Sequence, residues 1–489
     1  MTCTEFSLVK ERWIPIQGVG LVSLDELFSN PSLKDLGGSP IQKISLFKFL
    51  LAIAQSAYTP ETEVMWSELT ATDLAARCKA YVQKHAGAFD LYGSQPFLQM
   101  KGAFEAKFKP WGAINPEIAE GNTTVLTHQQ IFNYADNAQK ALDLLTLMSF
   151  AMGGKKVDNS VVLSKGFAGK SKSGKNAPSV GYLGFLHSFF LGETLWETLR
   201  LNLWTHERLR TEESKARFPA GLGVVPWEKM PEGEDCDVAR LLKNSLLGNL
   251  VPLSRFCLID GDGVRLTEGI GFAGYKEGIT DVTVSYRLQK NELKPLWVDP
   301  NRRPWRDLTA LLVEAYKSEV RNLQLSVFYG HCLHNQNSEQ EVRLWAGGLR
   351  VSTNAGEFYV SGSDDYVESL VTLTIETLGD EGFACLTQAM LELDNRSHQL
   401  FGCVSRYHQK LSNQETKFAE AASNQFWSRA ERLCQSLLTA CLTQDQEAIV
   451  KLQKCFYGIV CDLYNEACPS SSARQLLAWT ACYPSYKLK

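Results

Sequence analysis

The chain has 489 residues, of which 44% are hydrophobic and 21% are charged, and its formal net charge at pH 7 is −4. This length exceeds a single domain of about 100–150 residues, so we expect at least one large core and a division into two domains. The slightly acidic balance argues against a protein that coats nucleic acid through bulk charge, so any nucleic-acid contact has to be local.

The sequence also bears on compartment and metal content. No apolar run approaches the roughly 18 residues of a membrane span, and no secretory pattern opens the chain, which predicts a cytosolic protein. The 13 cysteines are scattered, and some, such as Cys434 and Cys455, occupy apolar helix positions, so we expect reduced, buried thiols. The His-Cys-Leu-His run at His331 lacks an evident fourth ligand, and we expect neither a metal nor a cofactor.

Helical and strand-like patterns alternate over residues 1–364. Residues 44–58 and 136–150 carry apolar side chains at helical spacing, whereas residues 282–288 and 357–362 resemble strands. This alternation predicts one large mixed α+β domain. The Asp-Gly-Asp-Gly run at 260–263 has the chemistry of a hairpin turn and lacks the further carboxylates of a calcium loop.

Residues 365–489 have a mainly helical pattern. We expect amphipathic helices over residues 366–378, 383–404, 426–442 and 448–464, joined by short turns. Asp445 has the position of a helix N-cap. The pattern predicts a C-terminal four-helix bundle.

The most basic part of the sequence is the stretch 153–175, whose only acid is Asp158. Its glycines and serines indicate a loop that brings backbone amides and lysines to phosphates. A solvated surface loop without a ligand is the alternative interpretation. The lysines that we consider as DNA-backbone contacts are Lys155, Lys156, Lys170, Lys172 and Lys175.

A nucleotide-binding motif overlaps this stretch. The run from Gly169 to Lys175 matches the first seven positions of a Walker A phosphate loop. Position eight is Asn176, whereas the motif needs Ser or Thr there to ligate Mg²⁺. A phosphate-loop nucleotide hydrolase is therefore the second function that we consider, and a scaffold that docks a partner helix on its bundle is the third.

Two further polar or glycine-rich positions are candidates for binding. The glycine pair, Gly153 and Gly154, directly follows the helical stretch 136–152, where one glycine suffices as a C-cap and the second permits close approach to a DNA groove. Asn335, Gln336 and Asn337 form a polar tip, for which a turn is the default interpretation. Their amides both donate and accept hydrogen bonds, as a group that replaces a base pair must.

Catalytic signatures are missing from the sequence. It has no Gly-x-Ser-x-Gly elbow and no His-Glu-x-x-His motif, and its eight histidines are dispersed. We therefore favour a binding protein over an enzyme.

The order of these features resembles the CasA family, the large subunits of the type I-E CRISPR surveillance complex called Cascade. The similarity begins with FSLVKERWIPI, FDLYGSQPFLQMKG and GNTTVLTHQQIFN. It continues with the glycine pair, the lysine stretch, GFAGYKEGI, LWVDPNRRPWR, the HNQNS tip and the terminal helices, so it covers nearly the whole chain.

The resemblance implies a non-enzymatic subunit of RNA-guided antiviral defence. Such a subunit recognises the protospacer-adjacent motif (PAM) in duplex DNA, starts unwinding that leads to R-loop formation, and helps recruit a helicase-nuclease. Base pairing with the guide would carry most of the sequence recognition. The implied partners are the other Cascade subunits, the CRISPR guide RNA, double-stranded target DNA and the helicase-nuclease.

The resemblance also implies roles for individual residues. The glycine pair matches a loop that lies against the minor groove, and Lys276 matches a lysine finger inserted there. The polar tip matches a wedge that separates the first base pair. Arg302 and Arg303 depart from the family pattern and are candidates for backbone contacts, and Cys257 stands alone where some relatives have a cysteine-rich knuckle, so no metal is carried over. The start of a shorter first loop, with candidate contacts to the guide and the motif, is formed by Asn122, Thr123, Thr124, Val125 and Leu126.

Overall fold

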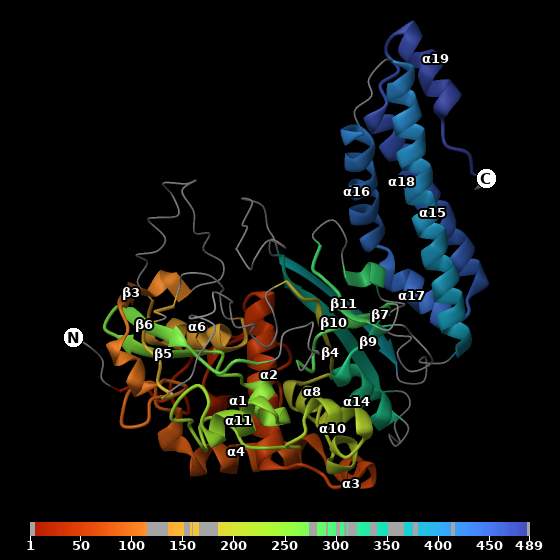
Figure 1. Ribbon diagram of the computed structural model, residues 1–489. Helices are drawn as coiled ribbons and strands as arrows, with labels where there is room; N and C mark the ends of the chain where they lie inside the picture. The colour runs from red at the N-terminus through yellow and green to blue at the C-terminus, as the bar shows by residue number, and fades with distance from the viewer. Residues whose placement is uncertain are drawn as a thin grey trace. The chain divides into compact units, whose positions relative to one another are not determined.

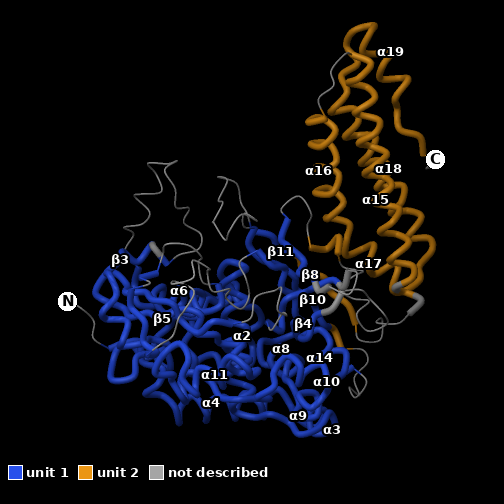
Figure 2. Tube along the Cα trace, viewed as in Figure 1, with its two compact units in different colours: residues 1–300, 319–337, 342–368 blue, residues 301–318, 338–341, 369–489 orange. Residues whose placement is uncertain are grey.

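The protein divides into two compact units, which are described separately (Figure 2). Unit 1 comprises Met1–Pro300, Glu319–Asn337 and Val342–Glu368, and unit 2 comprises Asn301–Ser318, Ser338–Glu341 and Ser369–Lys489. The computed structural model describes residues 5–114, 135–150, 157–158, 160–165, 184–272, 281–289, 292–299, 304–307, 311, 320–332, 340–350, 366–374, 380–411 and 416–486.

Unit 1 is organised around α2 (Pro40–Ala57), which is buried on nearly all sides. Pro40 pre-sets the first helical turn, and the Ser39 N–H donates to Gln42 Oε1 at 2.9 Å. Four helices pack against α2: α4 (Ala71–Lys84), α6 (Asn137–Ser149) and α8 (Leu195–Leu201), which are labelled in Figure 1, and α12 (Leu246–Leu250). The other described α-helices of unit 1 are α1 (Leu24–Leu27), α3 (Glu63–Glu68), α9 (His206–Leu209), α10 (Glu212–Arg217), α11 (Asp237–Lys243) and α14 (Leu323–Cys332).

Small antiparallel sheets complete unit 1. One sheet has the strand order β11-β10-β4, in which β4 (His187–Leu191) pairs with β10 (Glu341–Leu349). The boundary between the two units falls within its third strand, β11 (Tyr366–Thr374). The other sheets have the orders β1-β2, β3-β6-β5 and β8-β7-β9. Their strands are β1 (Ile14–Ile16), β2 (Gly20–Val22), β3 (Phe108–Pro110), β5 (Arg255–Asp260), β6 (Gly263–Glu268), β7 (Tyr286–Gln289), β8 (Glu292–Pro295) and β9 (Val320–Arg321).

Aromatic packing joins the central sheet to the central helix. In the β4 and β10 pair, Phe189 stands opposite Trp345. The Phe189 ring also stacks on Phe47 of α2, with ring centroids 3.8 Å apart and an interplanar angle of 4°. Aromatic pairs of this kind add to the stabilisation from apolar burial. The core of unit 1 therefore runs from α2 onto one face of β4.

Unit 2 is mainly helical. Its α-helices in the described ranges are α15 (Asp380–Lys410), α16 (Lys417–Glu431), α17 (Cys434–Leu442), α18 (Gln446–Ala467) and α19 (Ala473–Cys482). α15 packs against each of the other four (Figure 1). Asp445 caps α18 by accepting a hydrogen bond from the Ala448 N–H at 3.0 Å, as predicted.

The α+β class and the helical C-terminal bundle are confirmed, but several predicted elements are wrong in detail. Residues 366–374 form β11 rather than a helix. The buried residues Val367, Val371 and Leu373 lie on one face of a strand, because their spacing is even. The i, i+4 spacing of the first two also satisfies a helix, which explains the error.

The other corrections concern helix ends and one thiol. The helix predicted over 426–442 is broken at Arg432 and Leu433 into α16 and α17, and α19 was not predicted at all. α6 ends at Ser149 with Phe150 as its C-cap, so a glycine cap at Gly153 is wrong. Every described cysteine is free, but the Cys455 thiol belongs to an exposed residue. None of the helices in the described ranges has the length and apolarity to span a membrane.

Candidate nucleic-acid interface

The residues assigned to nucleic-acid contact by resemblance lie outside the part of the chain that the structure describes. The described residues show where the chain enters and leaves these segments. The candidates concerned are Gly153, Gly154, Lys276, Asn335, Gln336, Asn337, Lys155, Lys156, Lys170, Lys172, Lys175, Arg302, Arg303, Asn122, Thr123, Thr124, Val125 and Leu126.

The chain approaches the glycine pair from the C-terminal end of α6. This helix end is fixed by tertiary contacts, because Ser254 Oγ donates to the Met148 carbonyl at 2.5 Å. The next ring along the chain, Phe150, is buried and lies edge-on to His187 of β4, with centroids 5.4 Å apart. Phe150, the C-cap of α6 and the last described residue before the glycine pair, is therefore fixed against β4.

The segment that contains Lys276 is held on both sides. Before it, the Ile270 N–H donates to the Leu253 carbonyl at 2.8 Å. After it, Asp281 Oδ2 accepts from Lys48 Nζ of α2 at 2.7 Å. The side chains of Lys48 and Asp281 are 0% and 2% exposed, so this is a fully buried ion pair.

Asp281 is held in its charged form. Burial by itself disfavours a carboxylate, but the charge of Lys48 and its hydrogen bond hold the pKa of Asp281 below its usual value. The Thr283 N–H and Oγ1 donate to Asp281 Oδ1 at 3.0 and 2.8 Å. Removing one partner of such a pair typically costs about 3–5 kcal/mol, because the other charge is left uncompensated.

His187 lies beside this ion pair and is itself fully buried. Its Nδ1 lies 2.7 Å from Thr283 Oγ1. Burial lowers the pKa of His187 to about 4, and Lys48 contributes in the same direction against the opposing effect of Asp281. The imidazole is therefore neutral at pH 7 and serves as packing and hydrogen-bonding surface for its neighbours.

Asn322 connects the same place to α14. Its amide Nδ2 donates to the Thr283 carbonyl at 2.8 Å and to the Ser188 carbonyl of β4 at 3.2 Å. Its Oδ1 accepts from the backbone N–H groups of Gln324 and Leu325 at 3.0 and 3.1 Å. The last two bonds satisfy amides at the start of α14, so one side chain both caps the helix and joins it to β4.

Three sequence-distant segments therefore meet β4 at one buried place, which we call the β4 junction. It consists of Phe150, His187, Asp281, Thr283 and Asn322. The chain leaves this junction toward the glycine pair, arrives at it from the segment of Lys276, and begins α14, the helix before the polar tip, from it. The candidates for motif recognition are thus attached to a common scaffold.

The alternative interpretation, a nucleotide hydrolase, would need a carboxylate beside the bound Mg²⁺, and the acidic run 260–263 is a place in the sequence where one could stand. The acidic run 260–263 joins β5 to β6, with Gly261 at φ +57°, which confirms the predicted turn. Asp260 is paired with Arg265 of the same hairpin at 2.8 Å. The Walker A-like residues, Gly169 to Asn176, lie outside the described ranges.

Groupings of possible metal ligands are absent from the described residues. No cluster of three or more His, Cys, Asp or Glu side chains in these ranges has the arrangement of a metal site. His331 of the His-Cys-Leu-His run has both ring nitrogens within hydrogen-bond distance of other groups of the protein, Glu63 Oε2 and the Leu203 carbonyl.

The residues of the β4 junction were not predicted as a site. One signal was present in Lys48, the partner of Asp281 of the junction, because this lysine stands inside the apolar run ISLFKFLLAIA. A lysine on an otherwise apolar helix requires either an exposed position or a buried partner. Its partner, Asp281, is 233 positions away along the chain, and no local pattern identifies it.

The chain belongs to the Cse1 family of CRISPR-associated proteins, because the model of that family matches nearly its whole length. The family model described as "CRISPR-associated protein Cse1" matches residues 7–463. CRISPR-associated protein CasA/Cse1 of Thermus thermophilus is 29% identical to this chain over 351 residues. That alignment covers 65% of this chain and 64% of the relative, slightly less than two thirds of its length.

Solved structures share the fold. Cse1 of Thermobifida fusca has a TM-score of 0.70 with 19% identity, and the match covers 98% of this chain and 96% of that one. A chain of a CRISPR RNA-guided surveillance complex also has a TM-score of 0.70, with 16% identity and 98% of each chain covered. At these identities the comparison shows a common fold and assigns no residue roles.

Proposed function

We propose that this chain is the PAM-recognition subunit of a type I-E CRISPR surveillance complex. In this proposal it binds the motif in duplex DNA, opens the duplex beside the motif so that guide RNA can pair, and helps recruit a helicase-nuclease. Membership of the Cse1 family supports the general role. The observation that carries the finer role is the β4 junction, at which the described ends of segments with different predicted DNA contacts are joined.

Each proposed contact suits the surface that it would meet. The minor groove distinguishes mainly A·T from G·C pairs and presents acceptors that a lysine can reach, which suits Lys276. The glycine pair lacks Cβ atoms, so its backbone can approach the groove closely. The amides of Asn335, Gln336 and Asn337 can both separate the first base pair and satisfy the exposed bases.

Opening a base-pair step costs a few kcal/mol, which contacts to the DNA backbone can offset. We assign this role to Lys155, Lys156, Lys170, Lys172, Lys175, Arg302 and Arg303. Charged contacts to phosphate are independent of base sequence and sensitive to salt. Residues 122–126 are proposed to contact the guide RNA and the motif.

The proposed partners are the other Cascade subunits, the guide RNA, the duplex target and the helicase-nuclease. One structure that shares the fold is itself a chain of a CRISPR RNA-guided surveillance complex, which supports this choice. In our proposal residues 1–364 provide DNA recognition, and residues 365–489, which begin with β11, supply the helical bundle. The chain itself supplies recognition and strand separation, and bond cleavage belongs to the recruited nuclease.

The decisive test compares strand opening in the reconstituted, guide-loaded complex for the wild type and Gln336→Ala. Fluorescence of a base analogue next to the motif reports opening in an intact duplex and in a duplex pre-melted at that position. We expect Gln336→Ala to slow opening of the intact duplex about tenfold or more, since 1.4 kcal/mol corresponds to a factor of ten. The pre-melted duplex should behave as with wild type.

Gln17→Ala is the matched control, because Gln17 is an exposed glutamine in the β1 and β2 hairpin region. It should leave opening of both duplexes unchanged. Wild-type opening of the intact duplex by Gln336→Ala would contradict the wedge assignment. Tight, motif-specific binding by the isolated chain would contradict the proposed dependence on the complex.

A further inference from the structure

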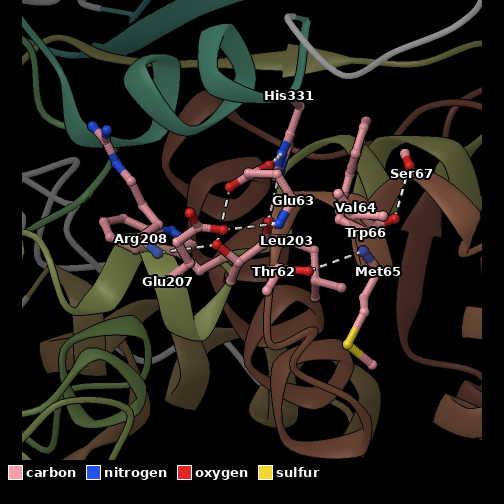
Figure 3. Close-up of polar contacts among 12 residues, drawn as sticks. Thr62, Glu63, Val64, Met65, Trp66, Ser67, Leu203, Glu207, Arg208 and His331 are labelled. Atoms are coloured by element: carbon pink, nitrogen blue, oxygen red, sulfur yellow. Dashed lines mark hydrogen bonds and ion pairs between the residues drawn. The ribbon is translucent and has the colours of Figure 1, made fainter.

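The end of α14 opposite the β4 junction is held by a second buried polar group (Figure 3). His331 lies in the last turn of the helix and is 1% exposed. Its Nε2 lies 2.7 Å from the Leu203 carbonyl, and its Nδ1 lies 2.5 Å from Glu63 Oε2 of α3. Both ring nitrogens are therefore engaged by residues far away in the sequence.

The hydrogen-bond chemistry fixes the proton on one side of the ring. A carbonyl oxygen only accepts, so His331 Nε2 carries a hydrogen that it donates to Leu203. The short contact between Nδ1 and the Glu63 carboxyl then needs one proton between them. An imidazolium with a carboxylate meets this need, as does a neutral imidazole with a protonated carboxyl. In either form a directional bond links α14 to α3.

Neighbouring groups restrict both side chains further. The His331 ring stacks on Trp66 of α3, with centroids 3.9 Å apart and planes at 5°. Trp66 Nε1 donates to the Arg200 carbonyl at 2.8 Å. Thr205 Oγ1 donates to Glu63 Oε1 at 2.9 Å. The ring plane, the carboxylate and the helix end are thus all positioned by separate contacts.

This arrangement is a poor device for stability alone. Burial lowers the pKa of His331, and Glu63 opposes this effect, so forming a charged pair works against desolvation. Apolar side chains of similar volume often stabilise a core equally well or better. What the polar pair adds is direction, because hydrogen bonds at both ring nitrogens define how the last turn of α14 is oriented.

We propose that His331 and Glu63 form a positioning pair that orients the end of α14, from which the chain continues to the polar tip. This inference rests on the proposed function of that tip in strand opening. Asn335 follows His331 by four positions in the sequence, so in this proposal the direction of the last helical turn of α14 sets where the polar tip begins. Loss of the pair then slows opening without removing any group that contacts DNA.

Two readouts separate this role from a structural one. The first is hydrogen exchange of the backbone amides of Tyr329 to Cys332 in the complete chain. The second is opening of intact and pre-melted duplexes by the guide-loaded complex. In His331→Ala we expect exchange at the end of α14 to rise about tenfold, and opening of the intact duplex to slow about tenfold, with the pre-melted duplex unaffected.

The chain offers matched variants. Glu63→Gln keeps a group that can donate to Nδ1 and accept from Thr205, so it should stay within about threefold of wild type. The double variant His331→Phe with Glu63→Leu keeps the volume of the pair and the stack on Trp66 but loses the hydrogen bonds that orient the helix end. It replaces His331→Ala in both measurements if that variant does not fold. Thr62→Ala removes the cap of α3, whose Oγ1 accepts from the Met65 N–H at 3.3 Å, and tests simple weakening of that helix.

The outcomes distinguish this inference from the proposed function. Unchanged exchange at the end of α14 in His331→Ala refutes the hold of the pair on the helix. Raised exchange with wild-type opening refutes the positioning role, as does an equal loss of opening in Thr62→Ala. If exchange is raised in His331→Ala but Gln336→Ala opens the intact duplex like the wild type, the proposed role of the tip is refuted instead.

Discussion

Replacing Lys48 with methionine removes the cation of the buried ion pair and leaves a side chain of similar length in the core. Asp281 then remains as a carboxylate with its Thr283 hydrogen bonds but without its charge partner. Its side chain is only 2% exposed, so water cannot compensate. In the variant, Asp281 is therefore either an unpaired buried charge or protonated at neutral pH, and both states cost stability.

The expected loss follows from the burial of the pair. Removing one member of a buried ion pair costs about 3–5 kcal/mol of unfolding free energy. The same helix provides a control, because Lys43 pairs with Glu368 at 2.6 Å with side chains 16% and 35% exposed. Lys43→Met should cost only about 0–1 kcal/mol, since solvent screens this pair.

Denaturant unfolding of the chain, followed by tryptophan fluorescence, measures both variants, because Trp13, Trp66 and Trp204 are fully buried in unit 1. Lys48→Met combined with Asp281→Asn removes the stranded charge and should lie within about 1–3 kcal/mol of wild type. Equal losses for Lys48→Met and Lys43→Met would refute the reasoning. So would a double variant less stable than Lys48→Met.

Three further predictions concern pH, a turn and salt. The pKa of His187 falls from 6.5 to about 4 on folding. The unfolding free energy should therefore keep its full value above pH 6.5 and fall by about 3 kcal/mol as the pH approaches 4. His187→Gln should flatten this profile in acid unfolding, and an unchanged slope would exclude His187 as its source. Gly261→Ala should lower the unfolding free energy by about 1–2 kcal/mol, because φ +57° is unfavourable with a Cβ, and a neutral substitution would show that the turn relaxes. Replacing Lys170, Lys172 and Lys175 with alanine should reduce the slope of log Kd against log salt for the complex by about 0.9 for each phosphate that the variant no longer neutralises, whereas an unaltered slope would place these lysines away from DNA.

Local patterns in the sequence predicted much of the fold. The apolar run of α2, the helix α6, the N-cap Asp445 and the hairpin at Gly261 are each determined by residues close together in the chain. Their signals are side-chain periodicity, capping and turn chemistry, which act over a few residues. These elements were accordingly predicted correctly.

The errors occur where a tertiary contact outweighs a local pattern. Val367 and Val371 fit a helix by spacing, yet they lie in a strand of a three-stranded sheet. Phe150 continues the apolar pattern of α6, but its ring packs against His187 and the helix ends before it. In both cases the competing partner comes from another part of the chain, so no window of sequence contains it.

The sequence by itself determined the family, the α+β class and which residues are candidates for DNA contact, because these depend on residue type and order. The tertiary structure alone decided how the ends of those segments are held. Asp281 meets Lys48 across 233 positions, and His331 meets Glu63 across 268. Such pairings form because burial makes an unpaired charge or polar group costly, and only the folded chain decides which partner is within reach.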